Sequence, residues 1–597
     1  MPGIRHLLCA MWLLGAASTA PAAQTLHEQL TALAQDLTYE TARLYPSQAT
    51  QWGITKYDAD FESVSEADRA AYIGRLRQWQ QRLQVIEHTT PAGATLMDRD
   101  DEQLLQAQLT QLLNTSLVYQ FDRKNYANGA ETVLSSINTQ LQFLPVSGQD
   151  GAGPEQVDKA WTDIIARLGK VPAFIEASQR LVTHPDHRFG VIGSETLAGA
   201  SDLLLDALTA AAKQHLGEDT AALARFIAAR DATLATISRT KAYIDAHVAQ
   251  WPTTFPMGRP AYDRMLRDEQ LLPFSSRDLE RLGQAELALG WAEEAWLTSL
   301  SQRESRPFGP TSGGGLAPGG PALIDYYKAR IDELTRYVRD KDVVTVPVWL
   351  GTIKVVETPL FMQPIYPGAS MNSPRLFAPE TSGYYFITPP KSLEEAAAHL
   401  DMNEDFDRDR ILNTGAHEAM PGHFLQLSIA RRHPDFIRKI QQATVFQEGW
   451  AFYGERMFVT LGLYGDDLDV RMFNARWERV RGARAIVDIK LNSGEWTFDE
   501  ATDFYARETS FSHEAAAAQV GSMAMTPGYL IAYTAGRLQL EQLLGDYQIA
   551  MGGARGSLHD FHDRLLSYGS VPFAILGPEL LADLDKSATE VRAAANY

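Results

Sequence analysis

Cysteine is nearly absent from this chain of 597 residues. The single cysteine, Cys9, lies in an apolar N-terminal stretch, so the rest of the sequence offers no thiol for a disulfide. Cys9 follows Leu8 rather than a small residue, and we therefore expect no lipid on it. The fold must be stabilised by its hydrophobic core, which a chain of this length can bury without difficulty.

Basic residues are also few relative to acidic ones. Lys and Arg number 54 against 74 Asp and Glu, which gives a formal net charge of −20. Nucleic-acid binding needs a basic face, so this balance argues against a nucleic-acid partner. With 45% hydrophobic and 21% charged residues, the composition is that of a globular protein, neither disordered nor fibrous.

A long hydrophobic run is missing as well. The apolar stretch Leu7 to Ala17 is too short to predict a membrane span. It follows Arg5 and precedes the small residues Ala20-Pro21-Ala22-Ala23, a pattern typical of a cleavable secretory signal. We expect residues 1–23 to be a signal peptide and the mature chain to be periplasmic or secreted. After cleavage it should have no stable membrane insertion.

Helix-forming residues dominate the mature chain. Leu26, Leu30, Leu33 and Leu37 recur at three- and four-residue steps, and similar patterns predict helices over 98–118, 154–182, 195–216, 219–248 and 276–303. No repeat of fixed period is present. Arg306 to Pro321 holds four prolines and three consecutive glycines, which predicts a lobe boundary or a flexible loop within one domain, residues 24–597.

Two runs of β-branched and aromatic residues predict strands. They are 343–356 and 383–388, and Pro347 favours an edge position for the first. An exposed edge could pair with an extended peptide backbone. The alternative is a small structural sheet.

The segment His417-Glu418-Ala419-Met420-Pro421-Gly422-His423 has the composition of a metal site. A hydrolytic zinc ion needs neutral imidazole ligands, an open position for water and a carboxylate beside that water. On an undistorted helix His417 and His423 would lie about 120° apart, too far for one ion. Pro421 and Gly422 can break or kink the helix, so we expect a distortion that brings the two imidazoles together.

A third ligand should come from another helix. Glu448 begins the run Glu448-Gly449-Trp450-Ala451-Phe452-Tyr453-Gly454-Glu455, which places a charge on an otherwise apolar and aromatic face. The turn at residues 431–435 allows a helical hairpin that makes Glu448 a neighbour of the histidines. The sequence therefore predicts a zinc ion held by His417, His423 and Glu448, with Glu418 as the catalytic base.

These two motifs, His-Glu-x-x-Pro-Gly-His-x-x-Gln and Glu-Gly-Trp-Ala-x-Tyr-x-Glu, resemble the bacterial domain-of-unknown-function-885 family. That family is similar to gluzincin metallopeptidases, whose zinc is held by two histidines and a downstream glutamate. The resemblance implies a mainly α, large two-lobed helical fold with a deep central cleft, and a small β-sheet near the metal site. It also implies cleavage of peptides.

Further family landmarks cover nearly the whole mature chain, among them 46–50, 484–488, 494–497 and 527–528. The chain departs from the family pattern at Lys490 and Asn492, where a glycine and a histidine are usual. It departs again at 519–523, which replaces an acidic-x-x-Arg-Tyr run.

Zinc peptidases of this type use a tyrosine or a histidine to stabilise the oxyanion, and Tyr533 matches that family position. Core packing is the alternative for this residue. Tyr529 and Arg537 recur at four-residue steps from Tyr533 and, with Tyr384, are expected to contact the substrate. Arg484 and Asp488 could form an ion pair, although an arginine of this helix could instead meet a substrate carboxylate.

The expected activity is hydrolysis of oligopeptides by water that Glu418 deprotonates at the zinc ion. Two alternatives stay open. One is a zinc-dependent hydrolase acting on a non-peptide amide or ester, and the other is a helical protein that captures peptides without cutting them. Peptide-end preference is also open, because Arg507, Lys490 or Arg537 could hold a free carboxylate and acidic residues a free amine.

Overall fold

The computed structural model describes residues 24–89, 93–147, 152–218, 220–308, 317–318, 321–360, 362–363, 369–388, 407–553, 556–586, 590 and 593. The expected signal peptide, residues 1–23, lies outside this set, as does most of the segment 306–321. The described part of the chain is mainly helical with one small sheet, as predicted.

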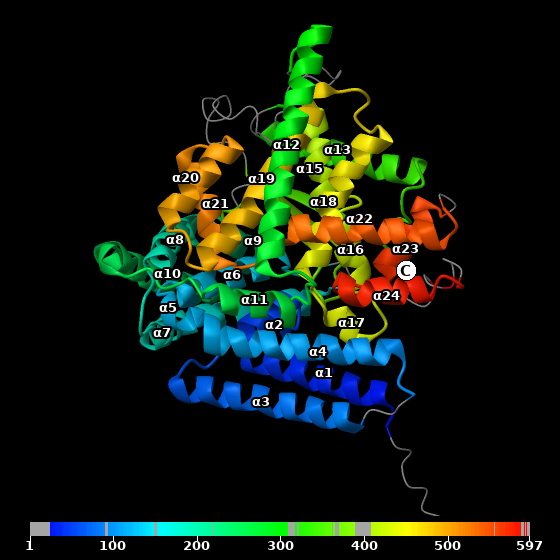
Figure 1. Cartoon of the computed structure of the whole chain (residues 1–597). Coiled ribbons are helices and arrows are strands. Elements are labelled where there is room, and N and C mark those ends of the chain that lie inside the picture. Colours follow the sequence, from blue (N-terminus) through cyan, green and yellow to red (C-terminus); the bar gives the residue numbers. More distant parts are fainter. Residues whose placement is uncertain are drawn as a thin grey trace, which may run out of the picture.

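The N-terminal helices form a layer along one side of the molecule, at the bottom of Figure 1. Thr25 caps the first helix through a capping box with Glu28, and the predicted leucine face is buried. The elements of this part are α1 Leu26–Leu44, α2 Pro46–Trp52, a 3₁₀ turn Thr55–Tyr57, α3 Glu66–Thr89 and α4 Leu96–Asn114.

A second group of helices has its own hydrophobic cluster, built mainly by α6, α7, α9 and α10. The predicted helix over 195–216 is divided, because a π-helical turn separates α8 from α9. The elements are a π turn Thr115–Tyr119, α5 Phe121–Lys124, α6 Asn128–Gln142, α7 Pro154–Leu181, α8 His187–Ala198, a π turn Asp202–Ala207, α9 Leu208–Leu216, α10 Ala221–His247 and a 3₁₀ turn Val248–Gln250.

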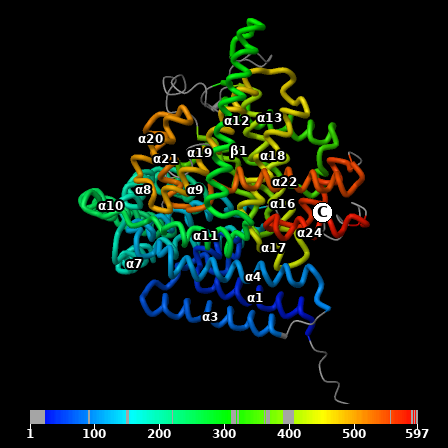
Figure 2. The backbone as a smooth tube through the Cα atoms, viewed as in Figure 1, coloured from blue at the N-terminus to red at the C-terminus, as the bar shows by residue number. Residues whose placement is uncertain are grey.

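Three helices and a three-stranded sheet follow. The long helix α12 packs along α19 and is the upright rod in Figures 1 and 2. The strand order is β1-β3-β2, with β1 parallel and β2 antiparallel to the central β3. The elements are α11 Arg259–Asp268, α12 Ser276–Glu304, α13 Pro321–Asp340, β1 Ile353–Glu357, β2 Ser370–Asn372 and β3 Gly383–Ile387.

The strand expected over 344–348 is not formed, so that part of the prediction was wrong. The backbone N–H of Thr345 donates to Asp563 Oδ1, and the carbonyl of Val343 contacts His562 Nδ1 at 2.8 Å. These side chains occupy the backbone groups that a strand would pair, and Pro347 has no N–H to offer. The strand that forms at the end of the predicted run is β1, which lies at one edge of the sheet as expected, and β2 lies at the other edge.

The remaining helices build the C-terminal half. Most of them share the largest hydrophobic cluster with α1, α3, α4 and α13, whereas α19, α20 and α21 form a smaller one. The elements are α15 Arg408–Glu418, α16 His423–Ala430, α17 Phe436–Ile440, α18 Thr444–Leu461, α19 Leu468–Asn492, α20 Phe498–Thr509, α21 His513–Met525, α22 Ala532–Ala550, α23 Leu558–Ser567 and α24 Phe573–Ala582.

Candidate metal centre

The predicted helix distortion lies between the two histidines. Helix α15 ends at Glu418 and α16 begins at His423, with a non-helical link between them. A Cβ at Gly422 would lie 1.7 Å from the carbonyl oxygen of His417, so only glycine fits this position. The indole N–H of Trp450 donates to the Pro421 carbonyl at 2.7 Å, which supports the link from α18.

The link brings the two imidazoles together on one buried site with Glu448. The ring centroids of His417 and His423 are 4.8 Å apart and perpendicular. Glu448 Oε2 lies 3.4 Å from Nε2 of His417 and 3.5 Å from Nε2 of His423. Zinc–nitrogen and zinc–oxygen bonds of about 2.0–2.1 Å place tetrahedral ligand atoms roughly 3.3–3.4 Å apart. Both distances from Glu448 Oε2 therefore match the ligand spacing around a zinc ion, and all three ligand atoms lie within 4.8 Å of one another.

The same atoms are unsatisfied without a cation. Glu448 Oε2 is buried and accepts no hydrogen bond from the described part of the chain. A buried carboxylate oxygen of this kind normally has a partner, and a metal ion would supply one. A bound metal ion would satisfy this oxygen, whereas hydrogen bonds within the described part of the chain do not.

A further carboxylate contacts His417 at the ring nitrogen that does not face Glu448. Glu455, two turns beyond Glu448 on α18, contacts Nδ1 of His417 at 2.7 Å. It also accepts from Nη2 of Arg481 on α19 at 2.6 Å. A carboxylate on the second nitrogen orients a ligating imidazole and fixes its tautomer. Sequence analysis missed both supporting residues, although the seven-residue spacing of Glu448 and Glu455 places them on one helix face.

Buried negative charge exceeds positive charge around the imidazoles. Burial lowers the pKa of His417, but the neighbouring carboxylates of Glu448 and Glu455 raise that pKa overall to about 10. Burial raises the pKa of Glu448, but the neighbouring imidazoles of His423 and His417 hold it well below its usual range. Burial also raises the pKa of Glu418. The cluster therefore attracts a cation, whether protons or a metal ion.

Two tyrosines complete the wall around the cluster. The Tyr533 ring stacks on His417 with centroids 5.8 Å apart. The Tyr529 hydroxyl donates to Glu448 Oε1, so this tyrosine supports a candidate ligand. Tyr529 precedes α22 rather than lying on it, which differs from the predicted helical face.

Helices α18 and α22 approach closely because glycines face each other. A Cβ at Gly449 would lie 2.5 Å from the carbonyl carbon of Gly536, and one at Gly536 would lie 2.0 Å from the carbonyl oxygen of Val445. Only glycine permits this contact. The Glu448-Gly449 pair therefore serves both to place a carboxylate and to admit the helix that carries Tyr533.

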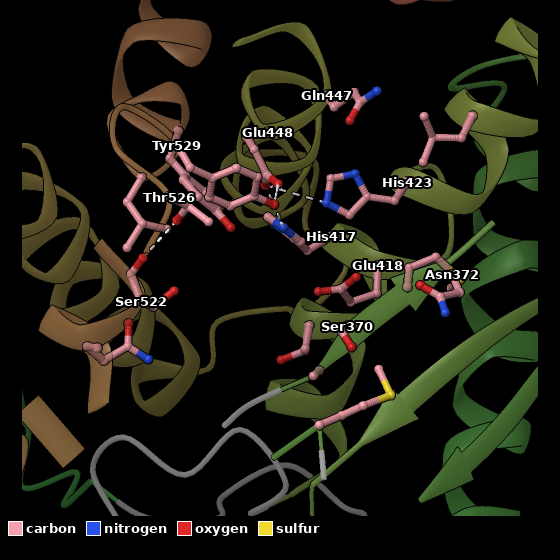
Figure 3. A pocket seen from close by; sticks show the side chains of 18 of the residues that line it. Ser370, Asn372, His417, Glu418, His423, Gln447, Glu448, Ser522, Thr526 and Tyr529 are labelled. Atoms are coloured by element: carbon pink, nitrogen blue, oxygen red, sulfur yellow. Dashed lines mark hydrogen bonds and ion pairs between the residues drawn. The ribbon is translucent and has the colours of Figure 1, made fainter. Parts of the chain in front are cut away.

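The cluster lies in the wall of a cavity of about 710 Å³. Figure 3 shows Glu418 between the histidines and the β2 residues Ser370 and Asn372, with Ser522 and Thr526 on another wall. Neutral polar side chains from α2, α6, β2 and α21 make up much of the lining. A volume of this size suits a small ligand or a short chain segment.

Arg537 and Tyr384 are not placed as predicted. Neither lines the cavity. Arg537 points away toward Glu286 on α12, with Nη2 and the carboxylate 2.6 Å apart, and it also pairs with Glu541. The Tyr384 hydroxyl donates to the carbonyl of Gln142. The prediction that these two residues contact substrate is corrected, because their polar groups are engaged outside the cavity.

The departures from the family pattern fall into two kinds. Lys490 pairs with Glu280 at 2.9 Å, and Asn492 donates to Asp488 and to the Met523 carbonyl, both away from the cavity. Gln519, by contrast, lines the cavity and accepts from Arg484 at 2.9 Å. Only the second departure bears on what the cavity holds.

Asp488 does not form the predicted ion pair with Arg484. It accepts instead from the Tyr262 hydroxyl and the Gly528 backbone.

Fold and site together define a large helical protein with a buried cluster of two histidines and a glutamate in the wall of a cavity. The chain belongs to the family described as bacterial protein of unknown function (DUF885), whose model matches residues 46–580. The predicted family membership is thus confirmed.

Two solved structures share the fold. One is a candidate lipoprotein of unknown function from Shewanella oneidensis, 19% identical, with a TM-score of 0.70 over 94% of this chain and 100% of that one. The other is a candidate lipoprotein from Colwellia psychrerythraea, 18% identical, with a TM-score of 0.74 over 94% of this chain and 99% of that one. No curated protein matches the sequence. Within the described ranges, none of the helices is both long and apolar enough to cross a bilayer.

Proposed function

We propose that this protein is a zinc-dependent peptidase of gluzincin type that hydrolyses oligopeptides in the periplasm or outside the cell. The observation that carries the proposal is a buried carboxylate oxygen of Glu448 at 3.4 and 3.5 Å from the Nε2 atoms of His417 and His423, with Glu418 in the same cavity wall. His417, His423 and Glu448 would hold the ion. A closed structural site would leave Glu418 without a role, and it would not border a cavity.

The chain's own residues supply the proton transfers. Glu418 takes a proton from the attacking water and returns it to the nitrogen of the leaving amine. A zinc ion bound by the three ligands would polarise the water and the carbonyl group. Tyr533, whose ring stacks on His417, would donate its hydroxyl to the developing oxyanion. Glu455 and Arg481 hold His417 in place.

The cavity lining favours a peptide as substrate. Ser370, Asn372, Ser522 and Thr526 offer neutral donors and acceptors to backbone amides. Strand β2 is an edge of the sheet and reaches the cavity through Ser370 and Asn372, so an extended peptide could pair with it. A non-peptide amide or ester would use the same catalytic groups, and substrate profiling separates the two.

Digestion of a mixed peptide library tests the proposal. The mature chain with measured zinc content should cut peptides, and a chelator should abolish the cuts until zinc is restored. Glu418→Gln should keep its zinc and lose activity by about 10³-fold, within the range for a lost proton-transfer group. Zinc binding without peptide cleavage would favour the non-peptide hydrolase, and peptide binding without zinc would favour a capture protein.

A further inference from the structure

Two buried arginines line the same cavity as the metal centre. Arg481 and Arg484 lie one turn apart on α19 and are 5% and 8% exposed. Guanidinium groups are rarely buried without an anionic partner, since removing the charge from water is costly. Arg481 is paired with Glu455 behind His417, whereas the proton transfers proposed above give Arg484 no part in the reaction.

The surrounding side chains hold both guanidinium groups in position. Their Cζ atoms lie 4.8 and 5.5 Å from the Trp477 ring and 5.5 and 5.4 Å from the Tyr533 ring. Gln519 accepts from Arg484 Nη2 at 2.9 Å. Arg481 donates one nitrogen to Glu455, and its Nε and Nη1 have no hydrogen-bond partner in the described chain.

Tyr533 relates these arginines to the reaction site. Its ring centroid lies 5.8 Å from that of His417 and 5.5 and 5.4 Å from the Cζ atoms of Arg481 and Arg484, so both guanidinium groups lie within about 11 Å of the His417 ring. An extended peptide advances about 3.3–3.4 Å per residue. A carboxylate held at the arginines would therefore lie about one to three residues from the carbonyl group beside His417.

We propose that Arg484, with Arg481 beside it, anchors the C-terminal carboxylate of the peptide, so that the enzyme removes one to three residues from the C-terminus. This inference rests on the proposed peptidase function and names its substrate end. Arginine suits the role because its planar fork binds a carboxylate through two hydrogen bonds. An acidic side chain near the cleaved bond carries the same chemistry and is the other source of a carboxylate.

Matched peptides test the inference. One sequence is prepared with a free C-terminus and with a C-terminal amide, and a third version has the amide and an aspartate in the last position. The mature enzyme should cleave the free acid with a kcat/KM about 10- to 100-fold above that of the amide. The aspartate version should behave like the plain amide.

Substitution of Arg484 then tests whether this residue causes the preference for a free C-terminal carboxylate. Arg484→Gln should lower kcat/KM for the free acid about 10- to 100-fold more than it lowers kcat/KM for the amide, and circular dichroism checks that the variant is folded. Arg507→Gln is the matched control, because Arg507 is 63% exposed on α20 and does not line the cavity. It should change neither rate. Arg484→Lys should restore part of the preference.

Three results would overturn the inference. Equal kcat/KM values for the free acid and the amide would contradict the carboxylate anchor but would still support the proposed peptidase activity. Fast cleavage of the amide with the C-terminal aspartate would show that the arginines recognise an acidic side chain rather than the terminal carboxylate. If no peptide is cut, calorimetry can still measure how tightly Glu418→Gln binds the free-acid peptide and the amide peptide. Equal affinities for the two peptides would contradict a carboxylate anchor at Arg484. If Arg484→Gln does not fold, the wild-type comparison still decides.

Discussion

Two clusters in this protein contain the same kinds of residues, and they differ in almost every other respect. His417, His423 and Glu448 form one, and His27, Asp101 and Asp435 form the other. In each, one ligand atom per residue lies within 4.8 Å of the others. Proximity alone would therefore assign a metal to both.

The second cluster lacks a common focus. Nδ1 of His27 faces Asp101 at 3.8 Å, whereas its Nε2 faces Asp435 at 3.6 Å, and the side chain is 45% exposed. Asp101 is already paired with Arg438 at 2.8 Å. No residue of this cluster lines the large cavity.

In the first cluster one buried carboxylate oxygen, Glu448 Oε2, faces the Nε2 atoms of both histidines. Glu455 contacts the other ring nitrogen of His417, and Glu418 lines the same cavity. This shared oxygen and its support distinguish the proposed metal centre from the second cluster, whereas the residue types do not.

The sharpest way to separate the clusters is to remove one carboxylate from each without changing its shape. Glu448→Gln should lower zinc affinity by more than about 100-fold, since loss of a supporting residue alone costs about 10- to 100-fold. Asp435→Asn should leave zinc content unchanged. Metal analysis after dialysis against a weak chelator measures both. Loss of zinc in Asp435→Asn alone would reverse the assignment.

The second cluster should respond to protons instead. Burial raises the pKa of Asp101 to about 6 from 3.8, although Arg438 opposes this. The folded state therefore binds this proton more tightly, so its stabilising effect is present below pH 4 and is lost as pH rises through 6. Asp101→Asn should remove a pH-dependent change of up to about 3 kcal/mol between pH 4 and 7. Urea unfolding of the wild type and of Asp101→Asn at several pH values measures this difference. His27, Asp435 and Glu579 are kept as in the wild type in both proteins. An identical pH profile in the variant would contradict it.

A smaller effect tests the support of the first cluster. Glu455→Gln removes the carboxylate that holds His417 and should lower zinc affinity about 10- to 100-fold. Competition with a chromophoric chelator gives the affinity. Glu541→Gln is the control, because Glu541 is also paired with arginine but does not line the cavity. Equal affinities in the two variants would show that His417 needs no such support.

The ligand set of the proposed centre could be predicted because its signal is local. Pro421 and Gly422 interrupt a helical pattern between two histidines, and the two short helices α16 and α17 lead from there to Glu448 on α18. The helical class followed from periodicity in the same way.

Side-chain direction could not be predicted from spacing alone. Arg537 lies one turn beyond Tyr533, yet it is drawn to Glu286 on α12, which is 251 residues away in sequence. Arg481 reaches Glu455 because α18 and α19 pack together. The strand expected over 344–348 failed for the same reason, since Asp563 takes the backbone N–H of Thr345. Such tertiary contacts override local preference.

Anomalous diffraction at the zinc edge from crystals of the mature protein tests the central claim most directly. We predict one strong peak about 2.0–2.2 Å from Nε2 of His417, Nε2 of His423 and a carboxylate oxygen of Glu448. No peak should appear between His27, Asp101 and Asp435. A peak only at the second cluster, or none at the first in zinc-loaded crystals, would contradict the account.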